Sequence, residues 1–169
     1  MKKQFLIAIL ALLTLASCQK SGMQLFRGDY SFKTSRSVVL DEIVPEGDSV
    51  EPLSFTVSLL NEIGQLEISA LGNEKDSLLV VMNTMGGEVI VTHAFCDGNE
   101  IFLNDFEKNT LLFTGDSITL KNVMRVQASG QMYEDKTIIL NMIYEGEAET
   151  ANRDFSIYGD NIRMAATRN

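Results

Sequence analysis

The chain has 169 residues, of which 45% are hydrophobic and 22% are charged, and 14 basic and 23 acidic side chains give a formal net charge of −9. This composition is typical of a globular protein and excludes collagen-like, disulfide-rich and wholly disordered chains. A chain of this length forms one sizeable domain, since compact domains usually have about 100 to 200 residues. The acidic balance also disfavours nucleic-acid binding, because it repels phosphate.

The first residues have the order of features found in a secretory signal. Lys2 and Lys3 precede a nearly continuous apolar stretch over residues 5–15, and small residues stand just before Cys18. This stretch is too short to cross a bilayer core, which needs about 20 helical residues. We therefore expect a processed export signal and not a membrane-spanning helix.

The four residues Leu15-Ala16-Ser17-Cys18 resemble the lipobox of bacterial lipoproteins. The resemblance implies that residues 1–17 are a lipoprotein signal peptide and that the mature chain begins at Cys18. Its sulfur would carry a diacylglycerol, and its amino group a further acyl chain such as palmitate. Three chains make the attachment effectively permanent, because each buried methylene contributes about 0.8 kcal/mol. The alternative is a simple secretory signal in which Cys18 merely lies near the cleavage site.

Residues 18–24 are expected to form a short tether, and residues 25–169 a single domain close to the membrane. Cleavage before Cys18 removes two lysines and no acid, so the net charge falls from −9 to −11. In lipoproteins of the Bacteroidetes type, an acidic stretch after the cysteine resembles a surface-export signal. No such stretch follows Cys18, which favours a domain that faces the periplasm. We expect the lipid anchor to lie in the outer membrane. Cys96 then has no disulfide partner, and we expect it to be a small buried apolar residue.

Glycines punctuate the rest of the chain at intervals of about 8 to 17 residues, and the segments between them are rich in β-formers. An opening hairpin is expected over residues 27–33 and 36–43, followed by an exposed acidic loop over residues 41–51. Residues 53–59 alternate like a strand, although Leu59, Ile63 and Leu66 also fit a short helical turn. Further strands are expected over residues 65–71, 77–82, 88–96, 100–106, 117–133, 136–145, 155–158 and 161–167.

The clearest strand is the one over residues 117–133, where apolar and polar residues alternate so that one face is buried and the other is solvated. Gly130 lies inside it, where a bulge, a bend or a close approach of a neighbour is expected. About nine or ten strands with short connections predict an all-β fold, as an antiparallel barrel or a closed sandwich.

The sequence offers little catalytic chemistry. His93 is the only histidine, and it shares a strand parity with Val89, Val91 and Phe95. If this parity faces inward, His93 is either a hydrogen-bond donor in a ligand pocket or a structural histidine bonded to a neighbouring strand. One histidine and one free cysteine cannot build an ordinary zinc site, and no nucleophile elbow occurs. We therefore expect no enzyme activity, no metal and no cofactor.

Three short stretches carry a resemblance: the opening Arg27-Gly28-Asp29-Tyr30-Ser31-Phe32, the hairpin Gly130-x-Met132-Tyr133-x-Asp135, and the ending Asp160-Asn161-Ile162-x-Met164-Ala165. With the lipobox, they resemble small lipoproteins of Bacteroidetes that have calycin-like or lipocalin-like β-barrel domains. The resemblance implies a calycin-like barrel at the cell envelope.

Two functions follow from these features. The first is the binding of a small apolar ligand, such as a lipid or fatty acid, in the lumen of the barrel. The chain is rich in methionine and phenylalanine, which suit an adaptable apolar cavity. The alternative is a non-catalytic structural or adaptor module with a solid core, which holds an unidentified protein partner at the envelope. The expected ligand-binding residues are His93, Phe95, Met124, Met142 and Tyr144.

Overall fold

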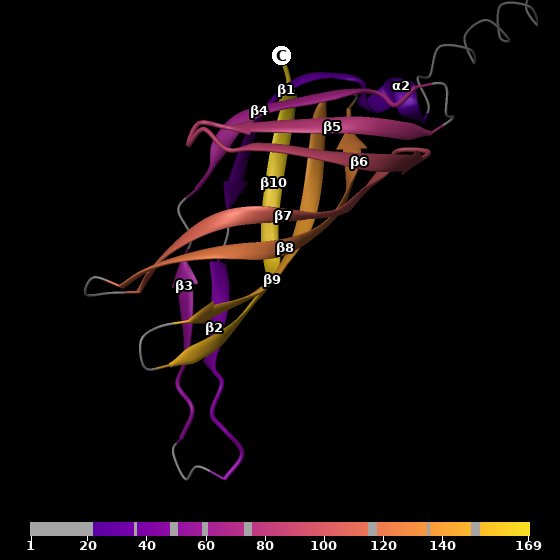
Figure 1. Ribbon diagram of the computed structural model, residues 1–169. Helices are drawn as coiled ribbons and strands as arrows, with labels where there is room; N and C mark the ends of the chain where they lie inside the picture. Colours follow the sequence, from indigo (N-terminus) through magenta and orange to yellow (C-terminus); the bar gives the residue numbers. More distant parts are fainter. Residues whose placement is uncertain are drawn as a thin grey trace, which may run out of the picture.

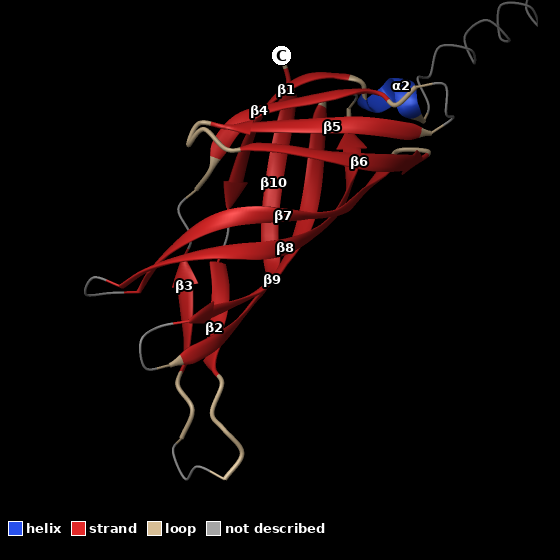
Figure 2. Cartoon of the chain, in the orientation of Figure 1, coloured by secondary structure: helices blue, strands red, loops and turns tan. Residues whose placement is uncertain are grey.

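The computed structural model describes residues 22–35, 37–47, 51–58, 61–72, 76–114, 118–134, 136–149 and 153–169, with the backbone alone for residues 110–114, 118–122 and 149. These parts contain one short helix, α2 (Met23–Phe26), and ten strands (Figures 1 and 2). The strands are β1 (Gly28–Ser35), β2 (Ser37–Glu42), β3 (Ser54–Ser58), β4 (Ile63–Ala70), β5 (Ser77–Thr84), β6 (Val89–Asp97), β7 (Glu100–Thr114), β8 (Ile118–Tyr133), β9 (Thr137–Glu149) and β10 (Asp154–Arg168).

Eight of these strands close into an antiparallel barrel. Their order is β1-β4-β5-β6-β7-β8-β9-β10, and pairing between β1 and β10 closes the ring. β2 and β3 continue the sheet beyond the barrel along the first half of β10. The prediction of an all-β antiparallel barrel is therefore confirmed, and the closed sandwich is not the architecture that forms. An eight-stranded barrel has an interior that its own side chains are just able to fill.

The expected opening hairpin is wrong. β1 pairs with the last part of β10, from Tyr30↔Arg168 onward, and β2 pairs with its first part, up to Phe155↔Glu42. The two strands thus follow one another along the same side of β10. A chain reversal needs about two loop residues, and only residue 36 separates β1 from β2.

The reversal comes instead after β2. β3 pairs back on β2, and β4 pairs back on β1, so that the second half of the hairpin is also split into two strands. Residues 54–58 and 63–70 are therefore extended, which decides against the helical turn. Leu59 and residues 48–50 of the expected acidic loop lie outside the described residues.

Apolar and polar residues alternate along the strands, and the apolar side chains fill the interior of the barrel. In β8, the predicted inward residues Met124, Val126, Ala128 and Met132 are buried, and Arg125, Gln127 and Ser129 are exposed. Ile118 and Leu120 were also predicted to point inward, but their side chains lie outside the described set. The buried apolar side chains belong to one contiguous core cluster.

Gly130 shows no bulge, because its register is regular on both sides, with Ile101 and with Leu140. The close approach is the reason for the glycine: a Cβ at this position would lie 1.9 Å from the carbonyl oxygen of Ile139. The register shifts lie elsewhere, between Leu103 and Phe106 in β7 and between Gly159 and Ile162 in β10.

Helix α2 covers the end of the barrel at which the described chain begins (Figure 1). Phe26 is fully buried, and the hydroxyl of Tyr30 donates a 2.6 Å hydrogen bond to its carbonyl oxygen. Arg168 Nη2 donates to the carbonyl oxygen of Leu25 at 2.5 Å and to the Tyr30 hydroxyl at 2.7 Å. The helix is thus joined to the first and last strands of the barrel.

The opposite end of the molecule is open. The β8–β9 register stops at Arg125↔Glu145, but β7 and β8 stay paired to Thr114↔Ile118, and β9 and β10 stay paired to Asp154↔Glu149. Two hairpin ends therefore diverge from the barrel at this last pair: a β7–β8 arm, residues 107–114 and 118–125, and a β9–β10 arm, residues 145–149 and 154–158. Figure 1 shows both arms, with the β2–β3 hairpin beside the second, directed away from α2.

Candidate functional site

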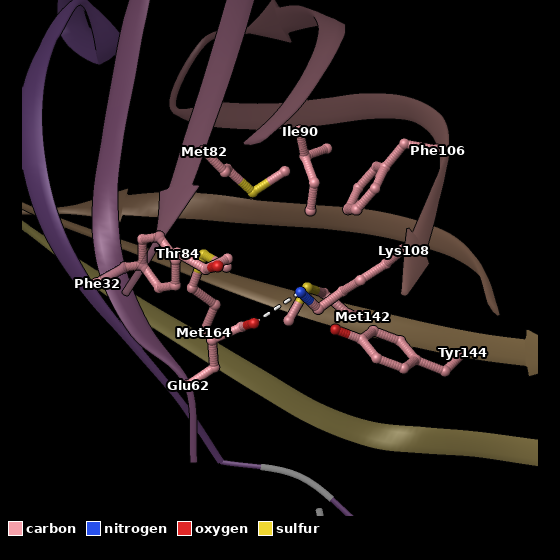
Figure 3. A pocket seen from close by; sticks show the side chains of 10 residues that line it. All are labelled: Phe32, Glu62, Met82, Thr84, Ile90, Phe106, Lys108, Met142, Tyr144 and Met164. Carbon is pink, nitrogen blue, oxygen red and sulfur yellow. Dashed lines mark hydrogen bonds and ion pairs between the residues drawn. The ribbon is translucent and has the colours of Figure 1, made fainter. Parts of the chain in front are cut away.

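The interior near the open end contains a cavity of about 10 Å³ (Figure 3). This volume holds about one water molecule, whereas ligand pockets measure about 300 to 1,000 Å³. The side chains around it are mostly apolar and include three methionines. They are Phe32, Glu62, Met82, Thr84, Ile90, Phe106, Lys108, Met142, Tyr144 and Met164. The protein's own side chains therefore occupy the lumen at this end.

Three of the five expected ligand-binding residues are interior. Met142 and Tyr144 line the small cavity and are almost wholly buried. Met124 is fully buried but does not line the cavity, and it lies opposite Lys108 in the β7–β8 register. Met142 and Tyr144 are thus brought together as core filling around a cavity of about one water, and Met124 belongs to the same core cluster.

The expectation that His93 and Phe95 face inward is wrong. Both are exposed on the outer face of β6, and the other parity of this strand, which includes Ala94 and Cys96, is buried. The apolar neighbours of His93 suggested a lumen because the outer face of β6 is itself apolar. Cys96 is 4% exposed, so the prediction of a buried thiol is confirmed, and burial raises its pKa.

The outer face around His93 is largely apolar. Val89, Val91 and Phe95 are 62%, 59% and 51% exposed, and the ring of Phe95 stacks on that of Phe102 with 4.8 Å between centroids. Val81 of β5 lies opposite Val91 on the same face. We call this surface the β5–β6 strip, which consists of Leu79, Val81, Val89, Val91, Phe95 and Phe102.

An ion cluster closes the barrel wall beside the small cavity. Lys108 is 3% exposed, and its Nζ lies 2.8 Å from Glu62 Oε1 and 2.9 Å from Glu88 Oε2. Glu88 also accepts a 2.8 Å hydrogen bond from the backbone N–H of Asn109. Figure 3 shows Lys108 directed toward Glu62, with the ion pair between them drawn as a dashed line. Both carboxylates neutralise the ammonium group, which is therefore a paired charge and not a free nucleophile.

This cluster connects β6 and β7 where their backbone pairing has ended. The β6–β7 register ends at Ala94↔Leu103, and beyond it Thr92 Oγ1 donates to the carbonyl oxygen of Asn104 at 3.0 Å. Glu88 and Asn109 then bridge the two strands farther along. Burial raises the pKa of Glu88, but the bonds from Lys108 and Asn109 outweigh it and hold the pKa below its usual value.

The sequence did not reveal Lys108 as an interior residue. The side chains of β7 that point into the barrel are Ile101 and Leu103 and, after the register shift, Phe106 and Lys108. The register shift between Leu103 and Phe106 changes the parity, so simple alternation would put Lys108 outside. Asn104-Asp105, two polar residues within an apolar alternation, are the one local sign of the shift.

An open groove of about 550 Å³ lies where the two arms diverge. Arg125 is in this groove and forms an ion pair with Asp105, which lowers the pKa of that carboxyl. The other charged side chains around it are acidic. The lining residues are Glu107, Val123, Arg125, Glu145, Gly146, Glu147 and Ile157.

Over the described parts of the chain, no three or more His, Cys, Asp and Glu side chains are grouped to hold a metal ion. In the same parts, no helix has the length and apolarity needed to span a membrane. Cys18, the expected lipidation site, lies outside the described residues. No protein-family model matches the chain, and a comparison with curated proteins finds no relative.

Proposed function

We propose that this protein is a lipid-anchored, non-catalytic module of the cell envelope that holds a protein partner through its outer surface. The observation that carries the proposal is the filled lumen, whose cavity at the open end measures about 10 Å³. A lipid or fatty acid needs a pocket of several hundred Å³. Binding in the lumen would therefore require several core side chains to move.

The arrangement of the two ends supports an anchored adaptor. The described chain begins at Gly22, beside α2, so the tether expected from Cys18 joins the domain at this end, and the two arms lie at the other end (Figure 1). The groove lies where the arms diverge. An attachment of this kind presents the groove to the compartment and away from the bilayer. Its diverging strands and open shape suit a segment of a partner protein better than a small apolar molecule.

The chemistry of the interior supports a non-catalytic role. Lys108 is held by two carboxylates, and the thiol of Cys96 is buried with a raised pKa. A reactive cysteine requires the opposite environment, one that lowers its pKa and exposes it. The function therefore belongs to the protein surface, anchored by the lipid at Cys18 and facing the periplasm from the outer membrane.

Site-specific photo-crosslinking in the producing cells tests the proposal. A photoreactive phenylalanine analogue replaces Val123 in the groove, and a matched variant carries it at Lys33, an exposed position on β1 away from the groove. We expect a discrete protein adduct from position 123 and none from position 33.

Native mass spectrometry of the gently extracted protein completes this test. We expect the mass of the lipidated chain with no additional small molecule. Absence of an adduct at position 123 would overturn the adaptor function. A stoichiometric apolar ligand, lost on replacement of Met142 by tryptophan, would instead support binding in the lumen.

A further inference from the structure

The β5–β6 strip is the feature that the proposed function leaves unexplained. Cross-strand pairing places its members side by side on one outer face: Val81 lies opposite Val91, and Phe95 opposite Phe102. None of its six members is charged, and the three from β6 are more than half exposed. Single exposed apolar residues are ordinary, but a contiguous apolar surface marks an interaction site.

The strip begins where the tether reaches the domain. The backbone N–H of Gly22, the first described residue, donates a 3.2 Å hydrogen bond to the carbonyl oxygen of Gly98. Gly98 follows Phe95 by three residues, in the turn between β6 and β7. One end of the strip therefore lies next to the point at which the chain leaves toward Cys18.

The length of the tether limits how far this turn can be from the bilayer. Four residue steps separate Cys18 from Gly22, and a fully extended chain covers at most about 14 Å over that distance. The headgroup layer on each side of a bilayer is about 5 to 8 Å thick. A lipid on Cys18 thus keeps Gly22, and with it the Gly98 turn at one end of the strip, close to the membrane surface.

We propose that the β5–β6 strip rests on the lipid bilayer, with Phe95 and Phe102 in the headgroup layer and the strip following the membrane surface. This proposal depends on the lipid anchor of the proposed function. Aromatic rings are favoured at this depth, and none of the six members carries a charge that would have to lose its hydration. Two polar side chains share this face: His93 lies opposite Leu79, and Glu67 lies opposite Val81 at the edge of the strip. At the tether end, Asp76 and Asp97 flank the strip, so zwitterionic lipid is favoured over anionic lipid.

Tryptophan fluorescence tests the proposal directly, because the chain contains no tryptophan. The full lipidated chain with Phe95→Trp is reconstituted into phosphatidylethanolamine vesicles that contain brominated phosphatidylcholine. Tyr158→Trp is the matched control, since Tyr158 is 45% exposed on the β9–β10 arm. We expect a blue-shifted emission and a several-fold greater quenching by bromine for Phe95→Trp than for Tyr158→Trp.

A second variant addresses the strip as a whole. Val91→Asp, added to Phe95→Trp, places a charge in the middle of the strip at a position that is 59% exposed, where the substitution leaves the core unchanged. We expect this change to lower the quenching toward that of the Tyr158→Trp control. Circular dichroism of each variant confirms that the barrel has folded.

The outcomes separate failure of the strip from failure of the anchor. Intact mass shows whether Cys18 carries its acyl chains, and an unmodified chain would overturn the anchor and this proposal together. A lipidated chain in which positions 95 and 158 are quenched equally weakly would overturn the proposal and leave the anchor intact. A blue shift that grows with protein density, without quenching by bromine, would assign the strip to a second copy and overturn the membrane contact.

Discussion

Individual residues set how closely the strands of this barrel approach one another. The clearest case is Gly130, where a Cβ would lie 1.9 Å from the carbonyl oxygen of Ile139 and 2.8 Å from Leu140 Cα. Both are backbone atoms, so no side-chain rotation relieves the contact, and the paired strand itself would have to move. Gly64 is a second such position, because a Cβ there would lie 2.2 Å from the carbonyl oxygen of Asn83.

We expect Gly130→Ala to destabilise the protein by about 3 kcal/mol, the upper end of the usual cost of overpacking, because the clash involves backbone. The control is Gly86→Ala, since the nearest atom to a Cβ there is Thr84 Oγ1 at 3.6 Å, an ordinary contact. The midpoint of urea unfolding measures both variants. Equal midpoints for the two would contradict the close approach of β8 and β9.

The Glu88 carboxylate makes stability depend on pH. Burial raises its pKa, but the bonds from Lys108 and Asn109 outweigh burial and leave the pKa below the usual 4.5. A carboxyl with a lower pKa in the folded state contributes stability above its unfolded pKa, and this contribution is lost as the pH falls through the folded value. We therefore expect the free energy of unfolding to fall below about pH 4.5, in part because of Glu88.

Urea unfolding at several pH values between 6 and 3 checks this dependence. Glu88→Gln should be less stable than the wild type at pH 6 and should lose less stability on acidification. Glu67→Gln on the outer face of β4 is the control, because it leaves the Glu88–Lys108 ion pair intact. A Glu88→Gln variant with the same decrease as the wild type would show that Glu88 does not contribute to the acid sensitivity.

At the scale of elements, the short helix α2 is held by tertiary contacts and not by its own length. A helix of four residues is not stable alone, because fixing the backbone of its first turn costs more free energy than the hydrogen bonds of that turn provide. Phe26 is fully buried, and Tyr30 and Arg168 bond to the carbonyl oxygens of Phe26 and Leu25. The helix thus depends on β1 and β10, which it covers.

We expect Phe26→Ala to cost about 3 to 5 kcal/mol, as for other buried phenylalanines, because it removes a fully buried ring at the end of the core. Gln24→Ala, at an exposed position of the same helix, is the control and should change stability little. Thermal or urea unfolding followed by circular dichroism compares the two. Similar stability of both variants would mean that α2 does not seal the barrel.

The elements also show what could be predicted from the sequence. Alternation located the strands and the inward face of β8, since a strand that is half buried has a period of two. It failed at β7, where the register shift between Leu103 and Phe106 changed the parity and concealed Lys108. It also failed at β6, where both faces are apolar and the pattern alone cannot distinguish the lumen from the outside. The pairing of β1 and β2 with β10 depends on residues more than 100 positions away, which local patterns do not report.

At the scale of the whole molecule, the two ends of the barrel differ in kind. The α2 end is covered and lies beside the expected tether, and the other end diverges into two arms around an open groove. Between them, the core is continuous and the cavity next to Lys108 holds about one water. Such a molecule has its accessible chemistry on the outside, which is why the proposed partner and membrane contacts both involve its surface.

A filled lumen predicts that ligand binding can be created by removing side chains. Met142 is 1% exposed and lines the small cavity, so Met142→Ala should enlarge it and cost about 2 to 5 kcal/mol. An enlarged apolar cavity stays dry and accepts a small apolar molecule such as benzene. Benzene should therefore raise the unfolding temperature of Met142→Ala, because a ligand that binds only the folded state stabilises it.

The wild type should show no such increase, and neither should Gly86→Ala, whose substitution lies in the exposed turn between β5 and β6. An equal increase in the wild type would show that its lumen opens to ligands, and would favour the binding of a small apolar molecule over the adaptor.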